Sequence, residues 1–75
     1  MSFENRPTND LIDILWNGGS FSINAGVRSH NDWLQLAHNA KQGGSQLTIT
    51  GVSTWSKQTI VDVAHAGKGH VFFVE

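Results

Sequence analysis

Apolar and polar side chains alternate in two short stretches of the chain, residues 20–24 and 46–50. Such alternation is typical of a strand with one buried and one exposed face. We therefore expect the apolar residues to point into a core, and the polar residues, among them Ser22 and Thr48, to point outward. Residues 70–75 are apolar almost throughout and predict a third strand that runs to the last residue.

Three further stretches place apolar residues at helical spacing. Thr8 or Asn9 is expected to cap the first helix and Ser29 or Asn31 the second, since these residue types accept a hydrogen bond from a free backbone N–H. Each of these two helices is followed by a Gly-Gly pair, which favours a helix end. A third helix is expected over residues 54–66.

The prediction of the third helix depends on a comparison between two segments of the chain. Its β-branched residues favour a strand. However, Val-Ala-His at 63–65 matches Leu-Ala-His at 36–38, which lies in a clearly helical pattern. We therefore predict a helix there as well.

The segments around the first two predicted strands are also similar to each other. Residues 21–29 and 47–54 both read apolar, hydroxyl, Ile, polar, Gly, Val, with one inserted residue, Ala25. The predicted order is helix–strand, three times, and strands joined by helices are parallel. The polar faces of the first two strands favour helices on one side of the sheet and the strand order 1-2-3.

This α/β arrangement, with a unit of roughly 25 residues, resembles the leucine-rich-repeat class. The resemblance rests on period and polarity, and the Leu-x-x-Leu-x-Leu-x-x-Asn signature of that class is absent. The alternative is a small doubly wound sheet with helices on both faces. In either case residues 1–7 are expected to form a flexible tail and residues 8–75 a single α/β repeat domain.

Composition narrows the classes of function. Charged residues are few and nearly balanced, with a net charge of −1, so nucleic-acid binding is not expected. There is no long apolar run for a membrane span, no signal-peptide pattern and no Cys, which together predict a cytoplasmic protein. A chain of 75 residues buries a small core, which favours a partner subunit.

The last strand is the expected place for a partner. Aligning Gly44 with Gly69 predicts that Val71 and Phe73 stand on the outer face, where the other strands carry hydroxyl groups. An apolar strand at a sheet edge tends to pair with another chain. We therefore expect a protein-binding module that forms a homodimer, through this edge strand or through the outer sheet face, with an interface that includes Ser22, Thr48, Val71 and Phe73.

A second hypothesis is a small protein that binds an anionic ligand. Ligands bind beyond the carboxyl ends of parallel strands, and helix N-termini there favour anions. The residues expected in this region are Arg28, Ser29, His30, Ser53, Thr54 and Trp55. The Ser and Thr residues are equally consistent with simple helix caps.

No catalytic residue can be assigned. His38 and His65 occupy matching positions, but no acidic third ligand accompanies them, so no metal site and no cofactor are expected. The chain is not expected to be an enzyme. A third hypothesis, a modulator of a larger enzyme, is equally compatible with an interaction module.

Overall fold

The computed structural model describes residues 6–26 and 28–75. The expected tail is therefore described only from Arg6 on, and Val27 of the repeated loop lies outside the described residues. Within these ranges no helix has the length and apolar character needed to cross a membrane. The elements, in chain order, are α1 (Thr8–Trp16), β1 (Phe21–Asn24), α2 (His30–Gly43), β2 (Leu47–Thr50), the 3-10 turn η2 (Val52–Thr54), α3 (Lys57–Gly67) and β3 (Val71–Val74).

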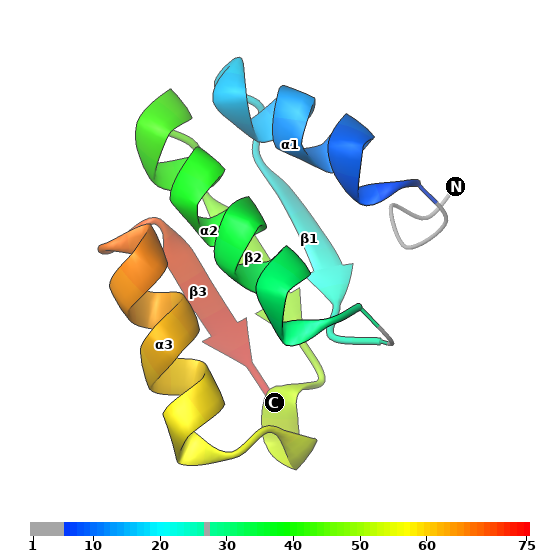
Figure 1. Cartoon of the computed structure of the whole chain (residues 1–75), viewed down its shortest axis with the longest axis vertical. Coiled ribbons are helices and arrows are strands. Elements are labelled where there is room, and N and C mark those ends of the chain that lie inside the picture. Colours follow the sequence, from blue (N-terminus) through cyan, green and yellow to red (C-terminus); the bar gives the residue numbers. More distant parts are fainter. Residues whose placement is uncertain (1–5, 27) are drawn as a thin grey trace.

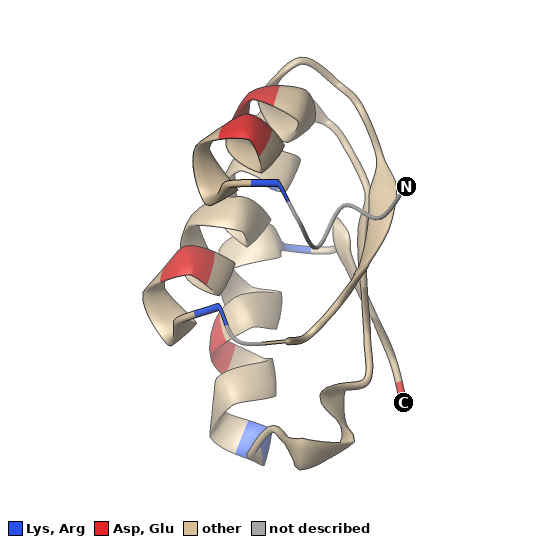
Figure 2. Ribbon diagram, turned by 90° about the vertical axis from the view of Figure 1, so that its right-hand side faces the viewer, with Lys and Arg blue, Asp and Glu red and all other residues tan. Residues whose placement is uncertain are grey.

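The three strands form one parallel sheet in the order β1-β2-β3. The helices lie side by side on one face of this sheet, which Figure 1 shows from the helix side. Figure 2 shows the same two layers edge-on, with the helices on one side and the strands on the other. The predicted α/β fold is thus confirmed with its strand order. The doubly wound alternative is wrong, since it needs helices on both faces.

The core lies between the two layers. β1 and β2 alternate as predicted, with Phe21, Ile23, Leu47 and Ile49 buried. Register aligns these residues in two inward-facing rows across the sheet. The helices complete the core with apolar residues at helical spacing. Those that are fully or nearly fully buried are Leu11, Leu15, Trp33, Leu36, Ala37, Ala40 and Val63.

The helix starts differ in part from the sequence predictions. Ser29 caps α2 as expected, because its hydroxyl accepts a hydrogen bond from the N–H of Asp32. Neither Thr8 nor Asn9 caps α1. Pro7 takes the N-cap position, and its carbonyl accepts from the N–H groups of Asp10 and Leu11. Pro suits the start of a helix because its fixed φ matches the extended N-cap backbone.

The predicted orientation of β3 is wrong. Val71 and Phe73 point inward and pack against the core, while Phe72 and Val74 are exposed on the outer face. The reason is the end of α3. Its left-handed C-cap is Lys68, with φ 45°, which takes the place that Gly44 has after α2. Aligning Gly44 with Gly69 therefore shifted the strand by one residue, and such a shift exchanges the two faces.

Gly43 allows α1 and α2 to approach each other closely. A Cβ atom added at Gly43 would overlap the backbone carbonyl oxygen of Leu15 and lie 2.7 Å from that of Trp16. Both obstacles are backbone atoms, which cannot rotate away. The last turn of α2 therefore requires Gly here for steric reasons.

We expect Gly43→Ala to lower the free energy of unfolding by about 3 kcal/mol or more, because the overlap can be relieved only by moving a helix. Gly44→Ala is the matched control. Gly44 has φ +70° and no atom within 4 Å of an added Cβ, so only backbone strain of about 1 kcal/mol is expected. Urea unfolding of both variants measures the difference, and equal losses would contradict the close approach.

Candidate functional site

Arg28 follows β1, where the ligand hypothesis placed it, but it is engaged by the chain itself. Its guanidinium donates to the hydroxyl of Thr8 at 2.7 Å and to the carbonyl of Arg6 at 2.7 Å. Thr8 in turn donates to a carboxylate oxygen of Asp32 at 3.3 Å. Arg28 thereby ties the segment before α1 to the first turn of α2.

The N-terminus of α2 also carries groups of the chain itself. The Ser29 hydroxyl accepts from the N–H of Asp32, and the Asp32 carboxylate itself lies in the first turn. A carboxylate at this position complements the positive end of the helix dipole. An added anion at this helix start would therefore meet a negative charge.

His30, in the first turn of α2, contacts α3. Its Nε2 lies 3.6 Å from a carboxylate oxygen of Asp62, and both side chains are partly exposed. The other oxygen of Asp62 accepts from the amide of Gln58 at 2.8 Å. His30 thus connects α2 to α3 on the outside of the helix layer.

The residue that caps the helix after β2 is not one of those that the sequence suggested. Ser53 and Thr54 lie exposed in η2, and α3 begins only at Lys57. The cap is Ser56, whose hydroxyl accepts from the N–H of Thr59 at 3.2 Å. Because Gly51 starts η2 in a left-handed conformation, the chain makes one short turn before the helix.

Trp55 is a packing residue in this structure. Its ring meets Trp33 edge-on at a centroid distance of 5.5 Å and Phe73 at 6.3 Å. Such edge-to-face pairs stabilise aromatic clusters beyond their buried area. Trp55 therefore links the loop after β2 to both α2 and β3.

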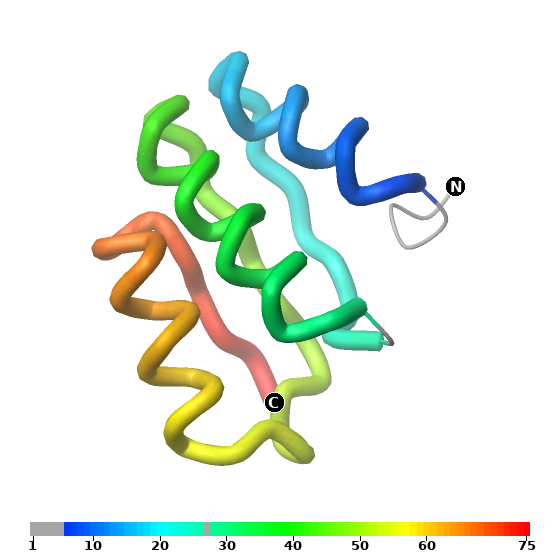
Figure 3. The backbone as a smooth tube through the Cα atoms, in the orientation of Figure 1, coloured from blue at the N-terminus to red at the C-terminus, as the bar shows by residue number. Residues whose placement is uncertain are grey.

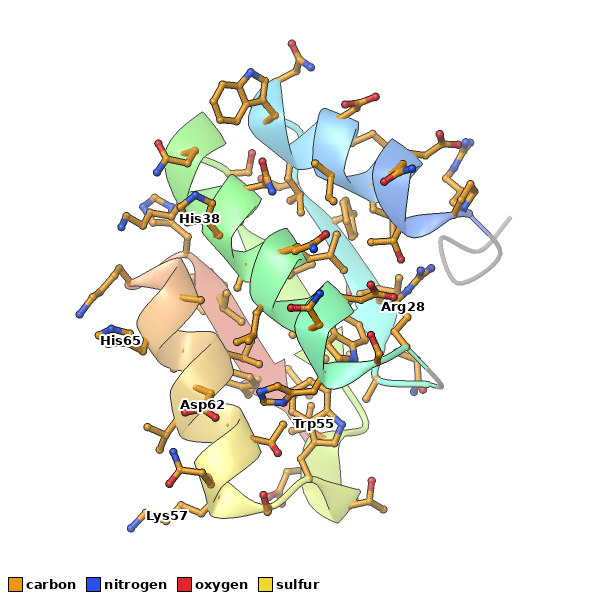
Figure 4. All side chains as sticks on the ribbon, in the orientation of Figure 1. Arg28, His38, Trp55, Lys57, Asp62 and His65 are labelled. Carbon is orange, nitrogen blue, oxygen red and sulfur yellow. The ribbon has the colours of Figure 1, made fainter. Side chains whose placement is uncertain are left out.

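The residues of the ligand hypothesis consequently have separate roles. Figure 4 shows Arg28 on the α1 side of the molecule and Trp55 below the start of α2. The contacts given above lead from Arg28 to Thr8, from His30 to Asp62 and from Trp55 to the core. Pattern alone could not show this, because the partners are distant in sequence.

No group of three or more potential metal ligands occurs in residues 6–26 and 28–75. His38 and His65, at the matching helix positions, are both exposed, one on α2 and the other on α3 (Figure 4). His70 has a structural contact instead, since its Nδ1 lies 2.8 Å from the carbonyl oxygen of Ser45.

The outer face of the sheet is the remaining candidate surface. Two rows cross it, Ser22–Thr48–Phe72 and Asn24–Thr50–Val74. Each row begins with polar residues on β1 and β2 and ends with an apolar residue on β3. Phe72 is 45% and Val74 47% exposed. The sequence predicted a polar face with an apolar last strand but named Val71 and Phe73 instead of these two residues.

Comparison of the chain with protein families, with curated proteins and with solved structures found no match.

We expect Ser56→Ala to lower the free energy of unfolding by about 1 kcal/mol, because it removes the side-chain cap of α3. Ser53→Ala is the control at an exposed position of the same loop, where a change below about 0.5 kcal/mol is expected. Thermal or urea unfolding distinguishes the two. A larger loss for Ser53→Ala would favour the earlier helix start that the sequence pattern predicted.

Proposed function

We propose that this chain is a small protein-interaction module that associates with a second copy of itself through β3 and the outer sheet face. The observation that carries the proposal is the exposure of Phe72 and Val74 in an edge strand. Single exposed apolar residues are ordinary, but these two lie next to each other on one face of β3, which pairs with β2 on one side and has no strand on its other side among the described residues.

The composition of the sheet supports an apolar contact. None of the strand residues is charged, and Figure 2 shows charged positions mainly on the helix layer, with Glu75 beyond the end of β3. Exposed edge strands are usually protected by Lys, Pro or a bulge. β3 has the sequence Val-Phe-Phe-Val and contains neither Lys nor Pro. A partner would therefore meet no unpaired charge there.

A second copy suits this surface for two reasons. The net charge of −1 gives little repulsion between copies. A two-fold interface also uses one patch on both subunits, so β3 needs no complementary surface elsewhere on the molecule. For a chain of this size, an added subunit increases the apolar area that folding can bury.

We expect sedimentation equilibrium to show a monomer–dimer equilibrium, and Phe72→Lys to raise the dissociation constant at least about tenfold. The reason is that a Lys ammonium loses water on entering an apolar contact. Trp16→Lys is the matched control. Trp16 is 57% exposed at the end of α1, and Figure 1 shows α1 on the β1 side of the molecule and β3 on the other side, so this variant should dimerise like the unmodified chain.

A strict monomer at high protein concentration would overturn the proposal. Equal weakening by both substitutions would remove β3 as the contact and show a general dependence on exposed apolar area.

A further inference from the structure

The free edge of β3 is shielded by α3. β3 pairs with β2 on one side and has no strand on its other side in residues 6–26 and 28–75. Figure 3 shows α3 farther from β1 than β3 is, so α3 extends beyond this edge. A strand of another copy that approached the edge with its helices on the same side would meet α3. The exposed side chains of Phe72 and Val74 are therefore reached from the outer face of the sheet.

The outer face carries two outward side chains from each strand. They form the rows Ser22–Thr48–Phe72 and Asn24–Thr50–Val74. All six side chains are uncharged, and each is at least partly exposed. Figure 2 shows the helices on the opposite side of the sheet, so a second sheet can approach this face without meeting a described helix.

From these features, and resting on the proposed function, we infer that two copies pack their outer faces against each other. The two-fold axis lies between the two sheets and runs across the strands. β3 then lies over β3 of the second copy, and the two strands run in opposite directions. The dimer has four layers in the order helix, sheet, sheet, helix. Sheets packed in this way are about 10 Å apart, with strand directions within about 30° of each other.

The position of the apolar residues decides the direction of the axis. Phe72 and Val74 both lie on β3, at one side of the face. An axis parallel to the strands at β2 would place them over β1 of the second copy, which presents Ser22 and Asn24. A parallel axis at β3 would leave β1 and β2 of both copies outside the contact. Only the axis across the strands joins the apolar residues of both copies and also covers all three strands.

The two rows match each other across this axis. With the axis midway between the rows, each row lies opposite the other row of the second copy. Apolar residues then meet apolar residues, and polar residues meet polar residues. The opposing pairs, each of which occurs twice, are Phe72 with Val74, Thr48 with Thr50, and Ser22 with Asn24.

The polar residues of the face can be buried with partners. Hydroxyl and amide groups both donate and accept hydrogen bonds, so the opposing polar pairs can satisfy each other. Part of this requirement is met within the chain. Asn24 Oδ1 accepts from the N–H of Gly26 at 3.0 Å, and the Thr50 hydroxyl donates to the carbonyl of Ile23 at 3.5 Å. The contact therefore buries no charge and leaves few polar groups to be paired.

Charge at the ends of β3 agrees with the antiparallel direction. β3 is preceded by Lys68 and followed by Glu75, and both side chains are exposed. In the proposed dimer the Glu75 end of one β3 lies toward the Lys68 end of the other. A parallel axis at β3 would instead place like ends together. Opposite charges that approach each other across an interface favour association in the correct orientation.

The area of the face agrees with a weak dimer. Figure 1 looks down the shortest axis of the molecule, which measures 29 by 27 Å across this view. The outer face can therefore bury at most roughly 800 Å² per copy, the amount that a specific interface of standard size buries. Because the strands occupy only part of this outline, the contact is smaller, and we expect an equilibrium that depends on protein concentration.

Substitutions on the strands away from β3 test the arrangement by sedimentation equilibrium. We expect Thr48→Lys on β2 and Ser22→Lys on β1 each to raise the dissociation constant at least about tenfold, because both place an ammonium group between the sheets. Gln35→Lys is the matched control, since Gln35 is exposed on α2 in the helix layer. Its dissociation constant should be that of the unmodified chain.

Intermolecular nuclear Overhauser effects provide an independent readout without substitution. In an equal mixture of isotope-labelled and unlabelled chains, we expect contacts from the Phe72 ring to the Val74 methyl groups of the other copy. The methyl groups of Val61 are the internal control. Val61 is 47% exposed on α3, in the helix layer, and should give no intermolecular contact.

Two results would overturn face packing while self-association stands. One is a dimer that Thr48→Lys and Ser22→Lys do not weaken, and the other is a set of intermolecular contacts from Val61 instead of Phe72. A strict monomer in the unmodified chain would remove the proposed function itself.

Discussion

The structure depends on the way in which consecutive parallel strands are connected. A crossover between parallel strands is right-handed, so a chain that always advances to the next neighbouring strand places every connecting helix on the same face. Here β1, β2 and β3 follow in sequence order, and α2 and α3 accordingly lie together with α1 on one side. The opposite face of the sheet stays uncovered by described residues, and this explains why Ser22, Thr48 and their neighbours are polar.

The same constraint makes the two ends of the domain unequal. α1 precedes the first strand and packs beside α2, so the rows of core residues are closed at β1. No described element follows β3, and Val71 and Phe73 remain partly exposed. Trp55 compensates in part, because it holds Phe73 and Trp33 in one aromatic cluster. The surface that remains is a small apolar edge, and the proposed association between copies of the chain rests on it.

Polar residues beyond the strands have mainly structural roles in this arrangement. Arg28 and Thr8 hold the start of α1 against α2, while Ser29 and Ser56 cap helices. These residue types also suit an anion site, and the pattern of the sequence is the same in both cases. The difference lies in partners such as Thr8 and Asp32, which are brought to Arg28 only by folding.

The sequence by itself determined the elements, their order and the facing of β1 and β2, because period-two alternation with polar residues leaves one choice of buried face. It also determined that the last strand is apolar at every position, whereas the first two strands are polar at every second position. The facing of β3 was decided by tertiary structure. Val71–Val74 is apolar at every position, so alternation gives no phase, and the phase follows from where α3 ends. The C-cap of α3 is Lys68, one residue before the Gly69 that the sequence comparison aligned with Gly44, and this shift of one residue turns Phe72 and Val74, rather than Val71 and Phe73, toward the outside.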